Sequence, residues 1–368
     1  MVTENKENLC TGCGICSVVC PKQCLTVQMN KDGFYQAVCD IENCVQCGLC
    51  DQVCPKFLEI QSQNPYKILS IVSGDEDVLR TTSSGGLCYE IANKALSDGK
   101  KVCACVYNYE LHRAEHIVVS DFSDLEATKG SKYFQSYTPD AFSQLFNGDE
   151  WVVFGTPCQI AALDAAARMK KMRNNFVLVD FFCHGTPSMN LWKKYILEQG
   201  GTKIKKIDFR SKEFGWHTFS LRFVHKDNTI HVDYEENMFY RLFFSNLCLG
   251  EACYSCKFKA FNSVADIRVG DFWGKKYQKD QKGVSCCAVF SEKGERTIEA
   301  LASVCSMQDE SAEEVLAAQM VRSPQYPKPR KRILRKLCGK CSLKCLYNVD
   351  LFCYRARLKL KSVLRRLK

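Results

Sequence analysis

Eight cysteines near the N-terminus form a repeat whose spacing suits iron–sulfur chemistry. The stretches CTGCGICSVVCP and CVQCGLCDQVCP both read C-x2-C-x2-C-x3-C-P. In bacterial two-cluster [4Fe–4S] proteins with this spacing, the fourth cysteine of each run ligates the other cluster. The repeat therefore predicts one cluster on Cys10, Cys13, Cys16 and Cys54, and a second on Cys44, Cys47, Cys50 and Cys20.

The repeat predicts a ferredoxin-type domain over residues 1–60, a module that carries electrons one at a time. Pro21 and Pro55 close the two runs, and LTVQMNKDGFYQAV between them is typical of a β-hairpin around Lys-Asp-Gly. Structural zinc is the alternative, but zinc ribbons normally use two separated cysteine pairs. Cys24 and Cys39 fall outside the pattern, and we expect them to be small buried residues.

A second group of cysteines lies far from the repeat. Cys253 and Cys256 in EACYSCKF supply only two of the four ligands that a tetrahedral metal site or a [4Fe–4S] cluster needs. Cys158 in GTPCQ and Cys183 in CHGTPS each follow an expected strand, and adjacent strands would bring them together. From spacing alone, a cluster on these four cysteines, a zinc site, a redox dithiol and ordinary core thiols all stay open.

Strands alternate with helices through the middle of the chain. We expect strands within residues 68–73, 101–108, 116–121, 151–158 and 176–183, and helices within 81–100, 159–172 and 188–201. This alternation predicts an α+β fold in which a mixed α/β domain follows the ferredoxin-type domain. The turn TSSGG (82–86) opens a helix, where an anion is favoured. No G-x-G-x-x-G occurs, so a Rossmann dinucleotide site is not supported.

The 25 cysteines do not indicate a secreted disulfide scaffold. MVTENKENLC lacks the apolar core of a signal peptide, no run of 18 apolar residues occurs, and the cysteine count is odd. A chain of 368 residues is also far longer than a disulfide-stapled miniprotein. We therefore expect a cytoplasmic protein whose thiolates bind metal.

The net charge of +10 belongs to the C-terminal end. From Lys328 onward there are fifteen Lys and Arg and one acid, which leaves 36 basic and 40 acidic residues elsewhere. Nucleic acid is therefore not an expected partner. Residues 326–368 predict a basic amphipathic helical tail, able to lie on an anionic membrane surface or an acidic partner; a solvated tail is the alternative. No role is assigned to the tail cysteines, which are Cys338, Cys341, Cys345 and Cys353.

Five motifs occur in one order behind the repeat. They are TSSGG, KGSKYFQS (129–136), GTPCQIAAL (155–163), CHGTPS (183–188) and CYSCKFKAFNSVADIRVGDFWG (253–274). Together with the repeat they resemble the coenzyme F420 hydrogenase/dehydrogenase beta-subunit family, over residues 1–60 and 66–320. The resemblance implies a domain of that type over residues 66–325.

Members of that family are iron–sulfur flavoproteins, so the resemblance implies FAD and a third [4Fe–4S] cluster. The cluster would be held by Cys158, Cys183, Cys253 and Cys256. The implied flavin pocket is formed by Ser83, Ser84, Gly85, Gly86, Lys132 and Tyr133. A plain helix-capping turn is the alternative for SSGG. His184, His217, Asp266 and Asp271 are cofactor contacts or local structural residues, and no general acid is assigned.

The function implied is that of an oxidoreductase. It would pass electrons between a two-electron carrier, such as the deazaflavin coenzyme F420, and FAD, the clusters and a redox partner protein or soluble carrier. One alternative is an electron-transfer adaptor without hydride chemistry. Another is a reductase in bacterial surface-polysaccharide assembly, for which a basic tail on the inner face of the membrane would be suitable.

Overall fold

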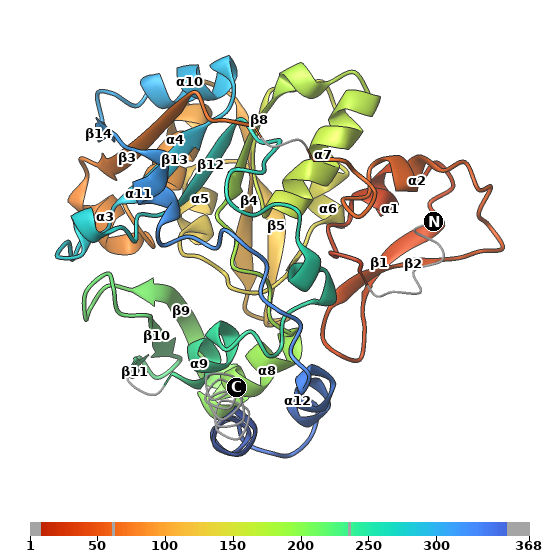
Figure 1. The fold of residues 1–368 in the computed structure, drawn as a ribbon, viewed down its shortest axis with the longest axis vertical. Helices are drawn as coiled ribbons and strands as arrows, with labels where there is room; N and C mark the ends of the chain where they lie inside the picture. Colours follow the sequence, from red (N-terminus) through yellow and green to blue (C-terminus); the bar gives the residue numbers. More distant parts are fainter. Residues whose placement is uncertain (1–8, 61–62, 235–236, 352–368) are drawn as a thin grey trace, which may run out of the picture.

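A computed structural model of the chain describes residues 9–60, 63–234 and 237–351, and three parts are distinguished in it (Figure 1). The N-terminal part contains the cysteine repeat. The central part is built on a nine-stranded sheet, and a smaller lobe carries a three-stranded sheet together with several helices. The predicted α+β class is confirmed.

A hairpin and two short helices form the N-terminal part. Its elements are α1 (Ile15–Val19), β1 (Leu25–Met29), β2 (Tyr35–Cys39) and α2 (Leu49–Gln52). The Asn30 side chain accepts hydrogen bonds of 3.0 Å from the backbone N–H groups of Asp32 and Phe34, which closes the turn between the strands. The predicted hairpin is confirmed, and its antiparallel register pairs Leu25 with Cys39.

The large sheet is mixed, with strand order β14-β3-β13-β12-β8-β7-β4-β5-β6. The strands are β3 (Lys67–Ser73), β4 (Lys101–Asn108), β5 (Arg113–Val119), β6 (Ser136–Tyr137), β7 (Trp151–Phe154), β8 (Phe176–Phe181), β12 (Ile267–Asp271), β13 (Ser285–Val289) and β14 (Cys305–Asp309). Neighbours β12, β8, β7 and β4 are parallel, so their carboxyl ends share one edge of the sheet. β7 and β8 are adjacent, as the sequence predicted.

Helices cover both faces of this sheet. Successive strand residues point to opposite sides, and apolar residues on both sides need to be buried. The helices concerned are α3 (Glu76–Thr81), α4 (Leu87–Ser97), α5 (Phe122–Thr128), α6 (Pro139–Phe142), α7 (Pro157–Met169) and α10 (Glu292–Glu299). Val152 and Val177 pack in one core cluster with α4, whereas Val153 and Leu178 pack in another with α7. The second cluster also contains Ile15 of α1, so the N-terminal part shares the core on the α7 side.

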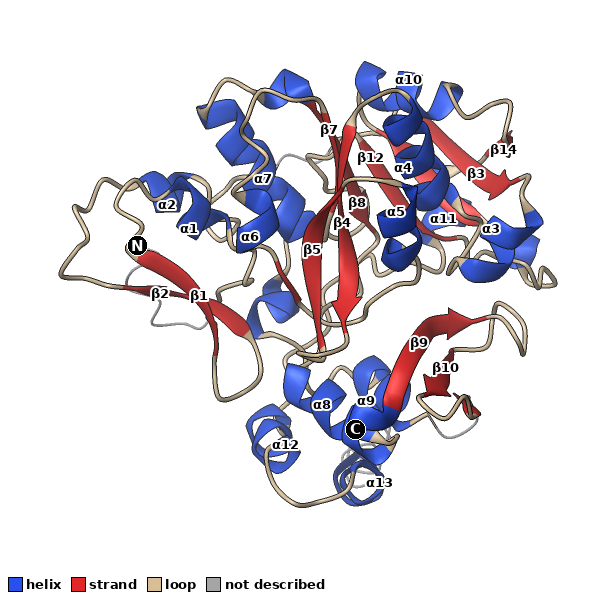
Figure 2. Cartoon of the chain, turned by 180° about the vertical axis from the view of Figure 1, so that it is seen from behind, coloured by secondary structure: helices blue, strands red, loops and turns tan. Residues whose placement is uncertain are grey.

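The smaller lobe joins three strands to four helices (Figure 2). Its elements are α8 (Met189–Glu198), β9 (Ile204–Ser211), β10 (Ser220–His225), β11 (Ile230–Asp233), α9 (Met238–Phe244), α12 (Arg330–Leu337) and α13 (Leu343–Leu346). Ile333, Leu334 and Leu337 of α12 are buried in the core of this lobe. The described part of the predicted tail therefore packs onto the protein, and the amphipathic stretch from residue 352 onward lies outside the described residues.

The remaining elements are short. They are α11 (Ala312–Leu316), a five-residue turn of helix at Tyr347–Leu351, and single helical turns at Arg173–Asn175, Gly201–Lys203, Glu251–Ser255 and Lys275–Tyr277. Within the described ranges, none of the helices has the length and apolar character needed to cross a bilayer.

Candidate metal centres and cofactor site

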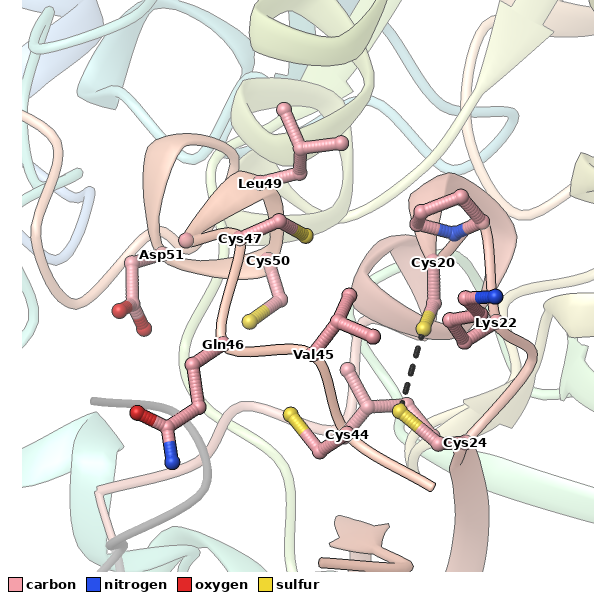
Figure 3. A pocket seen from close by; sticks show the side chains of 13 residues that line it. Cys20, Lys22, Cys24, Cys44, Val45, Gln46, Cys47, Leu49, Cys50 and Asp51 are labelled. Carbon is pink, nitrogen blue, oxygen red and sulfur yellow. Dashed lines mark hydrogen bonds between the residues drawn. The ribbon is translucent and has the colours of Figure 1, made fainter.

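The thiols predicted for the second cluster surround one pocket in the N-terminal part (Figure 3). The pocket is lined by Cys20 from the end of α1, Cys44 and Cys47 from the loop before α2, and Cys50 within α2. Gly48 precedes α2 with a φ of 74°, a conformation that glycine adopts without steric cost, and this turns the loop around the pocket.

The thiols predicted for the first cluster lie in electrostatic contact with one another. Burial raises the pKa of Cys13 well above its ordinary value, and the neighbouring Cys16, Cys10 and Cys54 raise it further. The Sγ atom of Cys10 lies 3.4 Å from the backbone nitrogen of Gly12, which donates to it. Crowded thiols of this kind favour a metal, because a bound metal lets them ionise together.

Both sets fit [4Fe–4S] clusters by the chemistry of their donors, since each offers four cysteine sulfurs and a loop that folds around them. Gly14 has a φ of 82°, and a Cβ there would lie 2.3 Å from Oγ1 of Thr138. A side chain is therefore excluded at this position, and the loop of the first set packs in direct contact with Thr138 of the central part.

Cys158 and Cys183 lie at the carboxyl ends of neighbouring strands. Cys158 is at the start of α7, whose first turn is closed by the reciprocal Thr156 and Gln159 contacts of a capping box. Burial raises the pKa of Cys158 well above its ordinary value; a contact with Thr156 lowers it, and Cys183, Cys13 and Cys256 raise it. Cys183 is in turn affected by Cys253 and Cys256, so these two thiols and the pair in CYSC lie near one another.

The segment that carries Cys253 and Cys256 is fastened to the sheet by two cations. Burial raises the pKa of Cys183 to about 12, and the neighbouring Lys259 ammonium partly opposes this shift. That ammonium donates a hydrogen bond of 2.7 Å to the Cys183 carbonyl oxygen. Arg268, fully buried, pairs with Asp180 at 2.6 Å and donates to carbonyl oxygens of the loop that follows the pair. Positive charge beside the thiols suits an anionic thiolate cluster.

The three thiol sets follow one another in space. Cys50 of the second set is among the neighbours that raise the pKa of Cys16 in the first, after burial itself and the thiols of its own set. Cys13 of the first set in turn acts on Cys158 of the third. Electrostatic contact therefore runs from the pocket of Figure 3 to the edge of the central sheet.

The residues expected at a flavin are partly brought together. Ser83 Oγ accepts a hydrogen bond of 2.9 Å from the backbone N–H of Ser131. Gly86, with a φ of 84°, precedes α4 and offers no side-chain cap, so backbone N–H groups of the first turn are free of a side-chain acceptor. Ser84 Oγ donates to the Val284 carbonyl oxygen at 2.8 Å, and Gly85 packs against the Ile71 carbonyl.

Lys132 has a different immediate role from the one expected. Its ammonium donates to the carbonyl oxygens of Thr128, Lys129 and Cys105, at 2.8, 2.9 and 3.0 Å. It thus closes the C-terminal end of α5, where a cation is favoured. Burial lowers its pKa to about 8. Tyr133 contacts a side chain and not the α5 carbonyl oxygens, because its hydroxyl accepts a hydrogen bond of 3.1 Å from Arg210.

Two residues that sequence reasoning missed, Arg210 and Lys212, join this site. Arg210, at the end of β9, pairs with Asp271 at 3.3 Å and stacks over Phe219 at 4.2 Å. Lys212 donates to the carbonyl oxygens of Leu79 at 2.5 Å, of Ser84 at 2.7 Å and of Lys282, so like Lys132 it also holds backbone together, and burial lowers its pKa to about 8. Both residues lie in the segment FRSK (209–212), but nothing in its spacing relates that segment to SSGG.

These residues fit the phosphate end of a flavin nucleotide. Two cations, the buried Arg210 and the half-buried Lys212, lie with one carboxylate, Asp271, beside the uncapped start of α4. Helix starts and cations are the groups that bind pyrophosphate in proteins.

The other candidates have local partners. His184 Nε2 lies 2.7 Å from Asn246 Oδ1, and His217 Nε2 lies 3.2 Å from the Tyr277 carbonyl oxygen. Asp266 pairs with Arg173 at 3.0 Å and accepts from the Leu178 backbone N–H. Their contacts are those of structural residues. The tail cysteines that the structure describes belong to none of the three thiol sets, and Cys338 is exposed beside Asn190. Cys353 lies outside the described residues.

The fold and the cysteine sets define an iron–sulfur protein with an attached α+β domain, and comparisons agree. Residues 9–57 match the family model of a 4Fe-4S dicluster domain. Residues 148–313 match the family model for the C terminus of the coenzyme F420 hydrogenase/dehydrogenase beta subunit, which confirms the resemblance over those residues.

One solved structure with a similar fold is a chain of the F420-reducing [NiFe] hydrogenase complex from Methanosarcina barkeri. The two chains are 16% identical with a TM-score of 0.52, over 79% of this chain and 94% of that one. At this identity the likeness concerns the fold alone. No curated protein matches the chain.

Proposed function

We propose that the chain is an iron–sulfur flavoprotein that moves electrons between a two-electron carrier and a protein partner. The observation that carries this proposal is the order of the three thiol sets, which runs from the N-terminal pocket to Cys158 at the edge of the sheet. The cation site of Arg210 and Lys212 belongs to the same sheet edge, because Asp271 ends β12.

The proposed ligands of the first two clusters follow from the spacing of the repeat, and those of the third follow from the family resemblance. One takes Cys10, Cys13, Cys16 and Cys54, a second takes Cys44, Cys47, Cys50 and Cys20, and a third takes Cys158, Cys183, Cys253 and Cys256. A bound flavin would accept an electron pair and release the electrons singly. Arg210 and Lys212 would hold its phosphates, with the Ser83–Gly86 turn beneath them.

The electron exit is proposed at the second set. Cys47 is exposed, and Val45 and Ile41 beside it expose 57% and 70% of their surface. Exposed apolar side chains around a redox centre suit a transient contact with a protein carrier. The matched family and the fold of the hydrogenase chain favour the deazaflavin coenzyme F420 as the two-electron carrier.

The test is anaerobic purification followed by metal and flavin analysis. About twelve iron atoms per chain, four for each cluster, and one FAD are expected. Reduced F420, NADH and NADPH are then offered in turn, with flavin absorbance as the readout. Bleaching by one of them supports the oxidoreductase. A flavin-free protein whose clusters accept electrons only from one-electron donors would instead be the adaptor without hydride chemistry.

A further inference from the structure

Two thiols outside the repeat lie against the second set. Cys24 immediately precedes β1, Cys39 ends β2, and the backbone N–H of Asp40 donates to the Cys24 carbonyl oxygen at 2.8 Å. The open end of the hairpin therefore places these two thiols side by side. Cys24 is buried and Cys39 partly so, which matches the expectation for Cys24, but neither is simply surrounded by apolar side chains.

Their sulfur atoms gather with two from the repeat. The sulfurs of Cys24, Cys39 and Cys44 all lie within 4.8 Å of one another, and among the described residues no other group of three or more potential ligands is so close. The Cys20 sulfur lies 3.4 Å from that of Cys24 (Figure 3) but outside the group of three, so it would have to move toward Cys39 and Cys44 to become the fourth ligand. In a tetrahedral zinc thiolate site with Zn–S bonds of about 2.3 Å, the sulfurs are about 3.8 Å apart.

We propose that Cys20, Cys24, Cys39 and Cys44 form a mononuclear tetrathiolate site for a soft divalent ion such as Zn²⁺. Binding of one ion replaces four S–H protons, which pass to solvent, by four metal–sulfur bonds. No oxidant or reductant is needed. All four donors are sulfur, the ligand that selects zinc over the harder divalent ions.

The site shares two thiols with the second cluster, as assigned under the proposed function. Cys20 and Cys44 serve both, Cys47 and Cys50 serve only the cluster, and Cys24 and Cys39 serve only the single ion. The two metals are therefore mutually exclusive in one chain. A chain that lacks the second cluster would keep its hairpin closed by zinc, and incoming iron–sulfur cluster would have to displace it.

The experiment uses the full chain from iron-limited and iron-replete cells, with Co²⁺ and Zn²⁺ as probes. The iron-limited wild type should bind Co²⁺ with strong thiolate-to-cobalt absorption, one equivalent of it at this site and the rest at the other empty thiol sets, and Zn²⁺ should displace it. Cys39→Ser should bind about one Co²⁺ per chain fewer and keep the iron content of the iron-replete chain. Cys47→Ser should do the reverse, losing about four iron atoms while binding Co²⁺ as the wild type does. Cys305→Ala, a buried thiol in β14, is the matched control.

Two results would overturn the proposal. In one, Cys39→Ser binds Co²⁺ with wild-type affinity and spectrum, which would place the ion elsewhere. In the other, the iron-limited wild type shows no thiolate-to-cobalt band even after reduction, which would leave these four residues as free thiols. If the wild type from iron-replete cells contains no iron, the proposed function is wrong. The Co²⁺ result would still decide whether the zinc site exists, because it does not depend on the clusters.

Discussion

The hydroxyl of Thr138 donates a hydrogen bond of 2.8 Å to the carbonyl oxygen of Cys13, and both residues are buried. This contact joins the central part to a cysteine of the first set. Because Gly14 also touches Thr138, the cysteine loop can approach no closer and has no space for a side chain. The position of the first cluster relative to the sheet is determined at this contact.

Removal of that hydroxyl should weaken the contact. Thr138→Val leaves the buried Cys13 carbonyl without its donor, and a lost partner of this kind costs about 1–3 kcal/mol. We expect a lower Tm and faster loss of iron to a chelator. Ser143→Ala, which removes an exposed hydroxyl from the end of α6, is the control and should change neither. Equal chelation rates for wild type and Thr138→Val would contradict this.

Loss of one thiol of the third set should remove one cluster. Cys253→Ala is expected to lower the iron content by about four atoms per chain and to leave the signals of the other two clusters in electron paramagnetic resonance. Cys248→Ala, which truncates a fully buried core thiol nearby, should keep all the iron. Unchanged iron in Cys253→Ala would return this pair to the zinc or core-thiol alternative.

Lys212 should matter for flavin affinity more than for folding. Loss of a charged hydrogen-bond donor typically costs about 1.5–3 kcal/mol, so Lys212→Met should raise the Kd for FAD about 10- to 100-fold. Lys206→Met, on an exposed position of β9, should leave the Kd unchanged. A lower Tm with an unaltered Kd would show that Lys212 only holds the Ser83–Gly86 turn together.

His116 should make stability fall in mild acid. Burial lowers its pKa from 6.5 to about 4, while its Nε2 lies 2.9 Å from the Phe154 carbonyl oxygen at the end of β7. Below pH 6.5 the unfolded chain binds a proton that the folded chain does not, so stability is lost as the pH falls from 6.5 to 4.

The full loss from this residue is about 3 kcal/mol. His116→Gln can keep the hydrogen bond without the titration, so denaturant unfolding should show a flatter pH dependence for the variant between about pH 7 and about pH 4.5. Parallel pH profiles of the free energy of unfolding for the two proteins would rule out this role of His116. A contribution of the clusters to acid instability is common to both proteins and cancels in the comparison.

The cysteine repeat was predictable because its ligands are near neighbours in the chain, and spacing alone places them around a common centre. Cys158 and Cys183 were predictable only through their strands, since β7 and β8 had to be adjacent. Arg210 and Lys212 come from β9 in another sheet and the turn after it, and no local pattern marks their distance from SSGG. Lys132 was expected in the flavin pocket, and its contacts with carbonyl oxygens at the end of α5 depend on the fold and could not be read from the motif.

Cys24 and Cys39 illustrate the same limit. As single residues outside a motif they resemble core thiols, and their proximity to Cys44 depends on the register of the hairpin. A pairing shifted by one residue would turn Cys39 to the other face of the hairpin.

Ile15 and Val19 of α1 are buried in the same core as Ile160 and Leu163 of α7. The N-terminal part is therefore packed on the central part and need not move relative to it to transfer an electron. Electron passage between the first and third sets is expected to be a first-order step within one packed body. Its rate should be independent of protein concentration and of solvent viscosity, whereas the step to an outside carrier should slow with both dilution and added glycerol.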